Sequence, residues 1–205
     1  MRAFVWLLPI TVPLALTSVA AQQPTTKPAP PKPAAAAQTP FRPVATIKEL
    51  MDALVDPQSD VVFEAVATIV TPGRIEEKAP RTDAEWAAVR RGTLLLIEGG
   101  NLLMVPGRRV AEPGAKSDVP GVELDPTEID ALISKNRGLF VRRAQGVVAA
   151  AQVALRAIDA KNSRALLDAA GALDVACESC HTDFWYPNQK EQLQKALEKQ
   201  KDVFK

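Results

Sequence analysis

The sequence predicts an all-α fold, and three features of the chain support this. Apolar residues recur at steps of three and four through most of residues 44–186, as on one face of a helix. Helix-start signals precede two of these stretches, and no stretch alternates in the way of a half-buried strand. Pro-Gly pairs separate the stretches. Four helices joined by two short connections and one long one predict a four-helix bundle.

The first helix is expected from about Ile47 to Val70, with a cap and restart that kink it near Pro57, and it should stop at Pro72-Gly73. The second should begin with a capping box of Thr82 and Glu85 and end at residues 106–107. Two glycines inside it, at positions 99 and 100, indicate either close approach of another segment or a bend.

A polar crossover leads to the third helix, expected from Pro126 to about Asp159, with Asp125 and Glu128 as its capping box. The fourth should start near Ser163. Its residues at helical spacing form a single face that turns both cysteines toward the interior: Leu166, Ala170, Leu173, Cys177, Cys180 and Phe184.

The chain begins like an exported protein. Residues 1–21 contain Arg2, an apolar stretch broken by two prolines, and small residues before Ala21, which is typical of a cleaved signal peptide. An uncleaved membrane anchor is the alternative. Residues 22–43 are rich in proline and alanine and predict a disordered linker. We therefore expect a periplasmic domain over residues 44–186, a helical extension over 187–205, and no stable membrane insertion after cleavage.

The charge balance argues against nucleic acid as a partner. Four of the 25 basic residues and none of the 24 acidic ones precede residue 44, so the rest of the chain has a net charge of −3. No basic stripe interrupts this balance.

The segment "CESCH" places the only two cysteines, Cys177 and Cys180, beside the only histidine, His181. A structural zinc site would need four ligands, a thioredoxin-like pair would follow a strand, and a disulfide here would be strained. Cys-x-x-Cys-His is the signature of covalent haem attachment. One helical turn separates the two thiols, so both can bond one porphyrin, and the imidazole that directly follows the second cysteine can bind the iron.

An exported, all-helical domain with this motif on its last helix resembles the class II cytochromes c, namely cytochrome c-prime and its low-spin relatives. The resemblance covers about residues 44–186 and is specific only at the motif. It implies one haem c per chain and a distal methionine early in the first helix, which is Met51 in "IKELMDAL". Met104 or an open iron site are the alternatives, and the linker and tail are additions to the family pattern.

A His/Met-ligated haem predicts a one-electron carrier that serves redox partner proteins and is not an enzyme. The alternative is a five-coordinate protein that binds small gases such as NO or CO. A haem enzyme ranks last because no second histidine is present for acid-base work. Lys48 is a candidate contact for the haem propionates, with Arg142 and Arg143 as alternatives. The sequence leaves open whether the protein forms a homodimer.

Overall fold

A computed structural model describes residues 41–190 of the protein. The expected signal peptide, most of the linker and most of the C-terminal extension fall in residues 1–40 and 191–205, outside the described part. Within residues 41–190, no helix combines the length and the apolar character that crossing a membrane requires.

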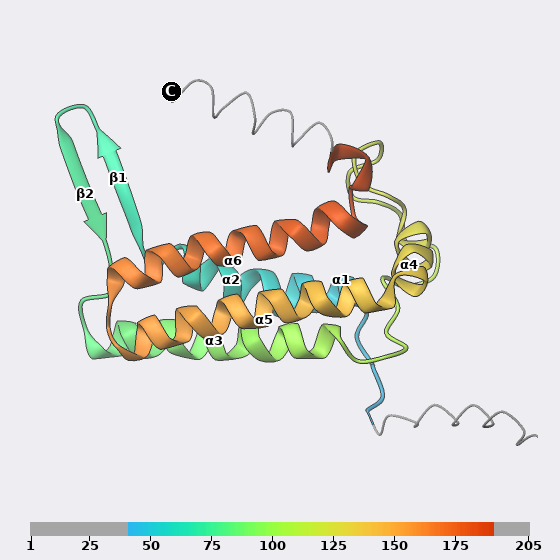
Figure 1. Cartoon of the computed structure of the whole chain (residues 1–205), viewed down its shortest axis with the longest axis horizontal. Coiled ribbons are helices and arrows are strands. Elements are labelled where there is room, and N and C mark those ends of the chain that lie inside the picture. The colour runs from blue at the N-terminus through green and yellow to red at the C-terminus, as the bar shows by residue number, and fades with distance from the viewer. Residues whose placement is uncertain (1–40, 191–205) are drawn as a thin grey trace, which may run out of the picture. The chain divides into compact units, whose positions relative to one another are not determined.

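The described part is predominantly helical, as the sequence predicts, with one small sheet (Figure 1). A π-helical turn, η1, joins the first two helices, and a 3-10 turn, η2, follows the last one. The elements in chain order are α1 (Ile47–Leu50), η1 (Met51–Val55), α2 (Asp56–Phe63), β1 (Ala67–Thr71), β2 (Arg74–Lys78), α3 (Asp83–Leu103), α4 (Pro126–Lys135), α5 (Arg137–Asp159), α6 (Ser163–Phe184) and η2 (Pro187–Gln189).

The expectation of a helix as far as Val70 is wrong from Glu64 onward. The chain forms an antiparallel hairpin instead, in which Val70 lies opposite Ile75. The run of β-branched residues over 68–71 favours a strand, and Gly73 turns the chain with a φ of 78°. The hairpin projects beyond the ends of the helices (Figure 1), so most of its side chains are exposed.

Pro57 produces a π-helical turn in place of the expected cap and restart. The N–H of Asp56 donates to the carbonyl of Met51, five residues back, and the backbone stays helical through both residues. Because Pro57 has no N–H and its ring crowds the preceding turn, the helix widens just before it. The widened turn carries Met51, the residue expected to face the haem.

The expected capping box at the start of α3 is confirmed. The Thr82 hydroxyl accepts from the N–H of Glu85 at 3.2 Å, and the Glu85 carboxylate accepts from the N–H of Thr82 at 2.8 Å. The α3 glycines mark close approach and not a bend. A Cβ on Gly99 would lie 3.1 Å from Val55 of η1, and one on Gly100 would lie 2.7 Å from Val148 of α5.

The expected third helix is divided at Asn136 into α4 and α5. Asn136 leaves the helical region with φ −121° and ψ 35°, and its side-chain amide donates to the carbonyl of Leu132. Asparagine competes with the helix for backbone partners in this way, so it ends one helix and precedes the next. The start of α4 is as expected, because the Glu128 carboxylate accepts from the N–H of Asp125.

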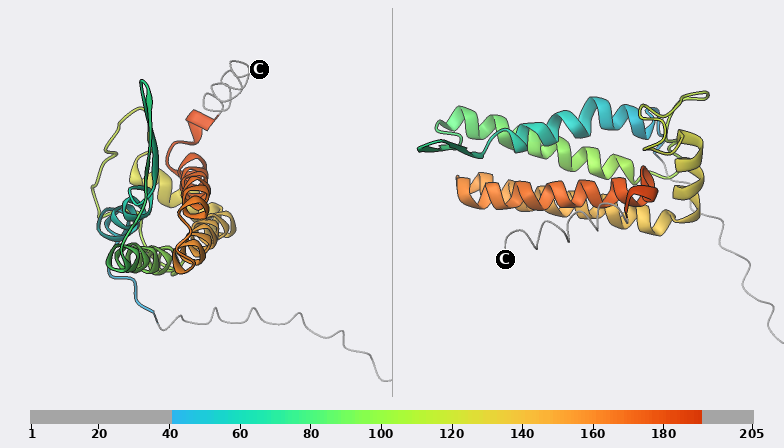
Figure 2. Two further views of the ribbon diagram at one scale, coloured as in Figure 1. Left: turned by 90° about the vertical axis from the view of Figure 1, so that its left-hand side faces the viewer. Right: turned by 90° about the horizontal axis from the view of Figure 1, so that it is seen from above.

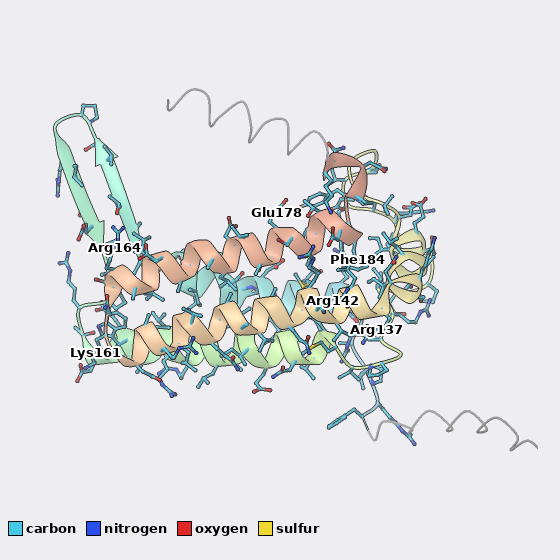
Figure 3. All side chains as sticks on the ribbon, in the orientation of Figure 1. Arg137, Arg142, Lys161, Arg164, Glu178 and Phe184 are labelled. Carbon is cyan, nitrogen blue, oxygen red and sulfur yellow. The ribbon has the colours of Figure 1, made fainter. Side chains whose placement is uncertain are left out.

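The long helices run along one another. α5 packs between α3 and α6, and the α1–α2 segment lies along α3 (Figure 2). Their apolar faces meet in a core in which Phe140 of α5 and Phe184 of α6 contact edge to face, 5.4 Å apart between ring centres. Phe184 lies close to the C-terminal end of α6 (Figure 3), so this contact fixes the part of the helix that carries the motif.

The long crossover over residues 104–125 is tied to both ends of the described chain. The first two amides of α1, at Ile47 and Lys48, donate to the carbonyls of Arg109 and Val110. Near the other end of the crossover, the N–H of Leu124 donates to the carbonyl of Trp185 at 2.8 Å. The crossover therefore links the start of α1 to the end of α6, where the candidate site lies.

Candidate functional site

Helix α6 presents the motif to the interior. It begins after Asn162, whose side chain accepts from the N–H of Ala165, and its register buries Leu166 and Leu173. Cys177 and Cys180 continue that face, are half-buried and pack against the core. The expected interior face of the last helix is therefore confirmed. Both cysteines are free.

An apolar cavity brings the predicted site residues together. It comprises about 410 Å³ of space, part of it open to solvent, and Met51 of η1 lies in its wall together with Cys177, Cys180 and His181 of α6. The rest of the wall is aliphatic or aromatic and comes from α1, η1, α3, α5 and the end of α6: Ile47, Val55, Leu103, Phe140, Ala144, Val147 and Trp185. Residues far apart in the sequence thus enclose one space without a polar lining apart from the imidazole.

Burial keeps both thiols protonated. It raises the pKa of Cys177 to about 11 and that of Cys180 to about 12, and neighbouring carboxylates such as Asp174 add to the effect at Cys177. Thiol-disulfide exchange requires a thiolate, which a reactive cysteine forms because its pKa is lowered. The surroundings of Cys177 and Cys180 raise the pKa of both thiols instead of lowering it.

A second, polar cavity opens beside the first and comprises about 750 Å³ of space, part of it open to solvent. Three residues line both cavities: Met51, His181 and Trp185. The polar cavity also contains Asp56, whose pKa is raised by partial desolvation although attraction to His181 opposes the change. The imidazole lies 5.9 Å from the Trp185 ring and 6.1 Å from the Tyr186 ring, measured between centres.

Of the candidate cations, the structure brings only Lys48 to a cavity. Its ammonium lines the polar cavity, 2.5 Å from a carboxylate oxygen of Asp118 and 3.4 Å from one of Asp52. Arg142 and Arg143 of α5 line neither cavity, and Arg143 is bound to Asp183 at 2.7 Å. Figure 3 shows Arg142 on α5, along the side of the molecule.

Met104 lies away from the site. It packs against the core at the end of α3 and lines neither cavity, and its carbonyl accepts from Arg137 at 2.6 Å. Of the two candidate methionines, Met51 alone is brought to the cysteines and the histidine.

Sequence reasoning missed the polar half of the site. Asp56 lies beside Pro57 and was expected only as a cap, and the crossover was expected only as a connection, yet Lys116 and Ser117 line the polar cavity. Tyr186 also lines the polar cavity, and its hydroxyl donates to the Glu178 carboxylate at 2.6 Å. These residues come together only through the tertiary fold, and no local pattern marks them.

The donor set of the apolar cavity can be compared with what a covalently bound cofactor needs. Within residues 41–190, no three His, Cys, Asp or Glu side chains are grouped to hold a metal ion. Two thiols and one imidazole facing an apolar cavity would fit a cofactor that bonds covalently to sulfur and offers its metal one nitrogen ligand.

Comparison with known proteins gives no relative. No protein-family model, curated protein or solved structure matches the chain.

Proposed function

We propose that this protein is an exported c-type cytochrome with a four-helix-bundle domain and one haem, and that it carries single electrons in the periplasm. One observation supports this most strongly. The two thiols and the imidazole of "CESCH" line an apolar cavity whose wall also holds Met51, the methionine expected as distal ligand. The four bundle helices would be the α1–α2 segment, α3, α5 and α6.

In this proposal Cys177 and Cys180 would hold the haem through thioether bonds, and His181 and Met51 would bind its iron. The bound haem supplies reversible one-electron chemistry. The protein's own contribution is to exclude water and to fix the ligands. Phe140 and Leu103 keep the cavity apolar, and the contact of Phe140 with Phe184 limits movement of α6.

The carrier function depends on Met51. When both axial positions are filled by the protein, little rearranges on reduction and no site remains for an external ligand. If Met51 did not bind the iron, the same cavity would suit a protein that takes up CO or NO. The position of Met51 in the shared wall of both cavities favours the carrier.

The test is expression in a bacterial host with the c-type haem attachment machinery. The purified, denatured protein should keep haem peroxidase stain on a gel, and the double variant Cys177→Ser with Cys180→Ser should lose it. Met104→Ala is the matched control, because Met104 lines neither cavity, and it should keep the stain. Haem that extracts freely into acidified butanone would contradict covalent attachment.

A further inference from the structure

Charge is distributed unevenly over the helices. The α1–η1–α2 segment carries four carboxylates and one lysine, and α6 carries four carboxylates and one arginine. α5 shows the reverse, with four arginines and one aspartate. The two acidic elements are the ones that provide Met51 and the cysteines, so the candidate site lies on the acidic side of the domain.

The acidic residues gather where the site opens to solvent. Four carboxylates and two lysines line the polar cavity: Asp52, Asp56, Asp118, Glu123, Lys48 and Lys116. Both lysines already lie within ion-pair distance of carboxylates, Lys48 of Asp118 and Asp52, and Lys116 of Asp125 at 3.7 Å. The opening therefore keeps an excess of negative charge.

Helix α6 carries further carboxylates beside the motif. Asp174 lies three residues before Cys177, and Glu178 directly follows it. The Glu178 carboxylate accepts at 2.6 Å from the hydroxyl of Tyr186, which lines the polar cavity. Val175, next to Asp174, is 64% exposed.

We propose that this acidic face, defined by Asp52, Asp56, Asp118 and Glu123 in the lining of the polar cavity, docks a one-electron redox protein whose contact surface is rich in lysine and arginine. The proposal rests on the proposed haem function. The ferrous protein gives one electron to the docked partner and becomes ferric, and no atom is transferred. Opposite charges steer the two proteins together, and a partner with an acidic face is repelled.

Small oxidants of opposite charge test the face directly on the holoprotein. The rate of oxidation of the ferrous protein is measured with a cationic cobalt(III) phenanthroline complex and with anionic hexacyanoferrate(III) at rising salt. Salt screens the attraction and the repulsion. The reaction with the cobalt complex should slow as salt rises, and the reaction with hexacyanoferrate should become faster.

Matched charge variants separate the local face from the net charge. The pair Asp52→Asn with Glu123→Gln removes two charges that line the polar cavity. The pair Glu77→Gln with Glu98→Gln removes two exposed charges on β2 and α3, which line neither cavity. At low salt the first pair should slow the cobalt reaction about 3- to 10-fold and the second less than about 2-fold.

Equal effects of the two pairs, or no effect of the first, would overturn the docking face while the protein stays red and reactive. The proposed haem function would be contradicted by a different result, because a chain that attaches no haem gives no coloured protein to oxidise. The experiment therefore distinguishes failure of the docking face from failure of the proposed function.

Discussion

At the scale of single residues, Met51 decides what the site can do. His181 and Met51 line the same two cavities from different elements, and the π-helical turn at Pro57 fixes how Met51 is presented. A thioether is a weak but specific iron ligand, so its presence or absence separates a carrier from a protein with an open iron position.

If the protein binds haem as proposed, Met51→Ala should convert the haem from six- to five-coordinate. The ferric wild type should show the weak near-infrared band of sulfur-to-iron ligation, and the variant should lose this band and take up CO in the ferrous state. Met104→Ala should keep the band, because Met104 lies outside both cavities. A wild type that is high-spin and binds CO freely would support the gas-binding alternative.

Lys48 offers a test of how the cofactor's carboxylates are held. Its pKa is raised chiefly by the hydrogen bond to Asp118, so the side chain is cationic at neutral pH. Removing a positive charge beside the iron favours the ferric state. Lys48→Ala should therefore lower the reduction potential measured by spectroelectrochemistry, and Arg142→Ala should change it less. A larger change in reduction potential for Arg142→Ala than for Lys48→Ala would instead indicate that α5 holds the propionates.

The motif residues could be predicted from the sequence, since a helix fixes the relation among Cys177, Cys180 and His181 within two turns. The wall that faces them could be predicted only in part. Met51 was proposed through a family resemblance, whereas Asp56 and the lining residues of the crossover depend on contacts across the fold. Such contacts leave no periodic pattern in the chain.

At the scale of elements, glycines let α3 approach its neighbours. A Cβ on Gly92 would lie 2.7 Å from one methyl carbon of Val61 and 3.0 Å from its Cβ. Gly92→Ala should therefore lower the free energy of unfolding by about 1–3 kcal/mol, measured by urea denaturation. Gly146 on α5 meets nothing within 4 Å, so Gly146→Ala should raise it by about 0.5–1 kcal/mol. Equal effects of the two would contradict this close packing.

The carboxylate of Asp183 ties three elements together. Its side chain is 7% exposed and accepts from Arg143 of α5 at 2.7 Å and from Lys190, after η2, at 2.8 Å. Burial alone would raise the pKa of Asp183, but the hydrogen bonds from Lys190 and Arg143 lower it below its ordinary value. A lowered pKa in the folded state stabilises the protein above the unfolded pKa, and this stability is lost as pH falls through the folded value.

Asp183→Asn should accordingly cost about 1–2 kcal/mol of unfolding free energy at neutral pH, and the difference from wild type should shrink below about pH 4. Urea titrations at several pH values measure it. Asp168→Asn is the control on the same helix, because its pairing with Arg164 is exposed and should contribute less than about 0.5 kcal/mol. A difference that persists unchanged in acid would rule out the ionised carboxylate as the cause.

Element boundaries were predictable where a cap stands beside a periodic stretch, as at Thr82 and Asp125. They were not predictable where two preferences competed. The segment ending at Val70 continues an apolar helical period, but its β-branched residues and the Pro-Gly turn made the hairpin more stable. At Asn136 the side chain competes for a helical carbonyl within a stretch that otherwise reads as one helix.

At the scale of the whole molecule, the apolar cavity should make stability depend on the cofactor. Its walls include Phe140, Leu103 and Val147, whose apolar side chains a bound haem would contact. The Cys177→Ser, Cys180→Ser variant should unfold at lower urea concentration than the haem-bearing wild type and bind the dye ANS. A variant as stable as wild type would show that the cavity closes on itself.

The hydrogen bonds that link the crossover to α1 and to the end of α6 also determine when the cavity can form during synthesis. The site's walls come from the first and the last helical elements of the described chain, with the crossover hydrogen-bonded to each. A chain that emerges N-terminus first therefore cannot enclose the cavity until the motif itself has emerged. Between the emergence of the motif and the packing of α6, both thiols are accessible to an enzyme that acts on an unfolded peptide, and once α6 packs they are half-buried. The two cysteines can therefore be modified only before α6 packs.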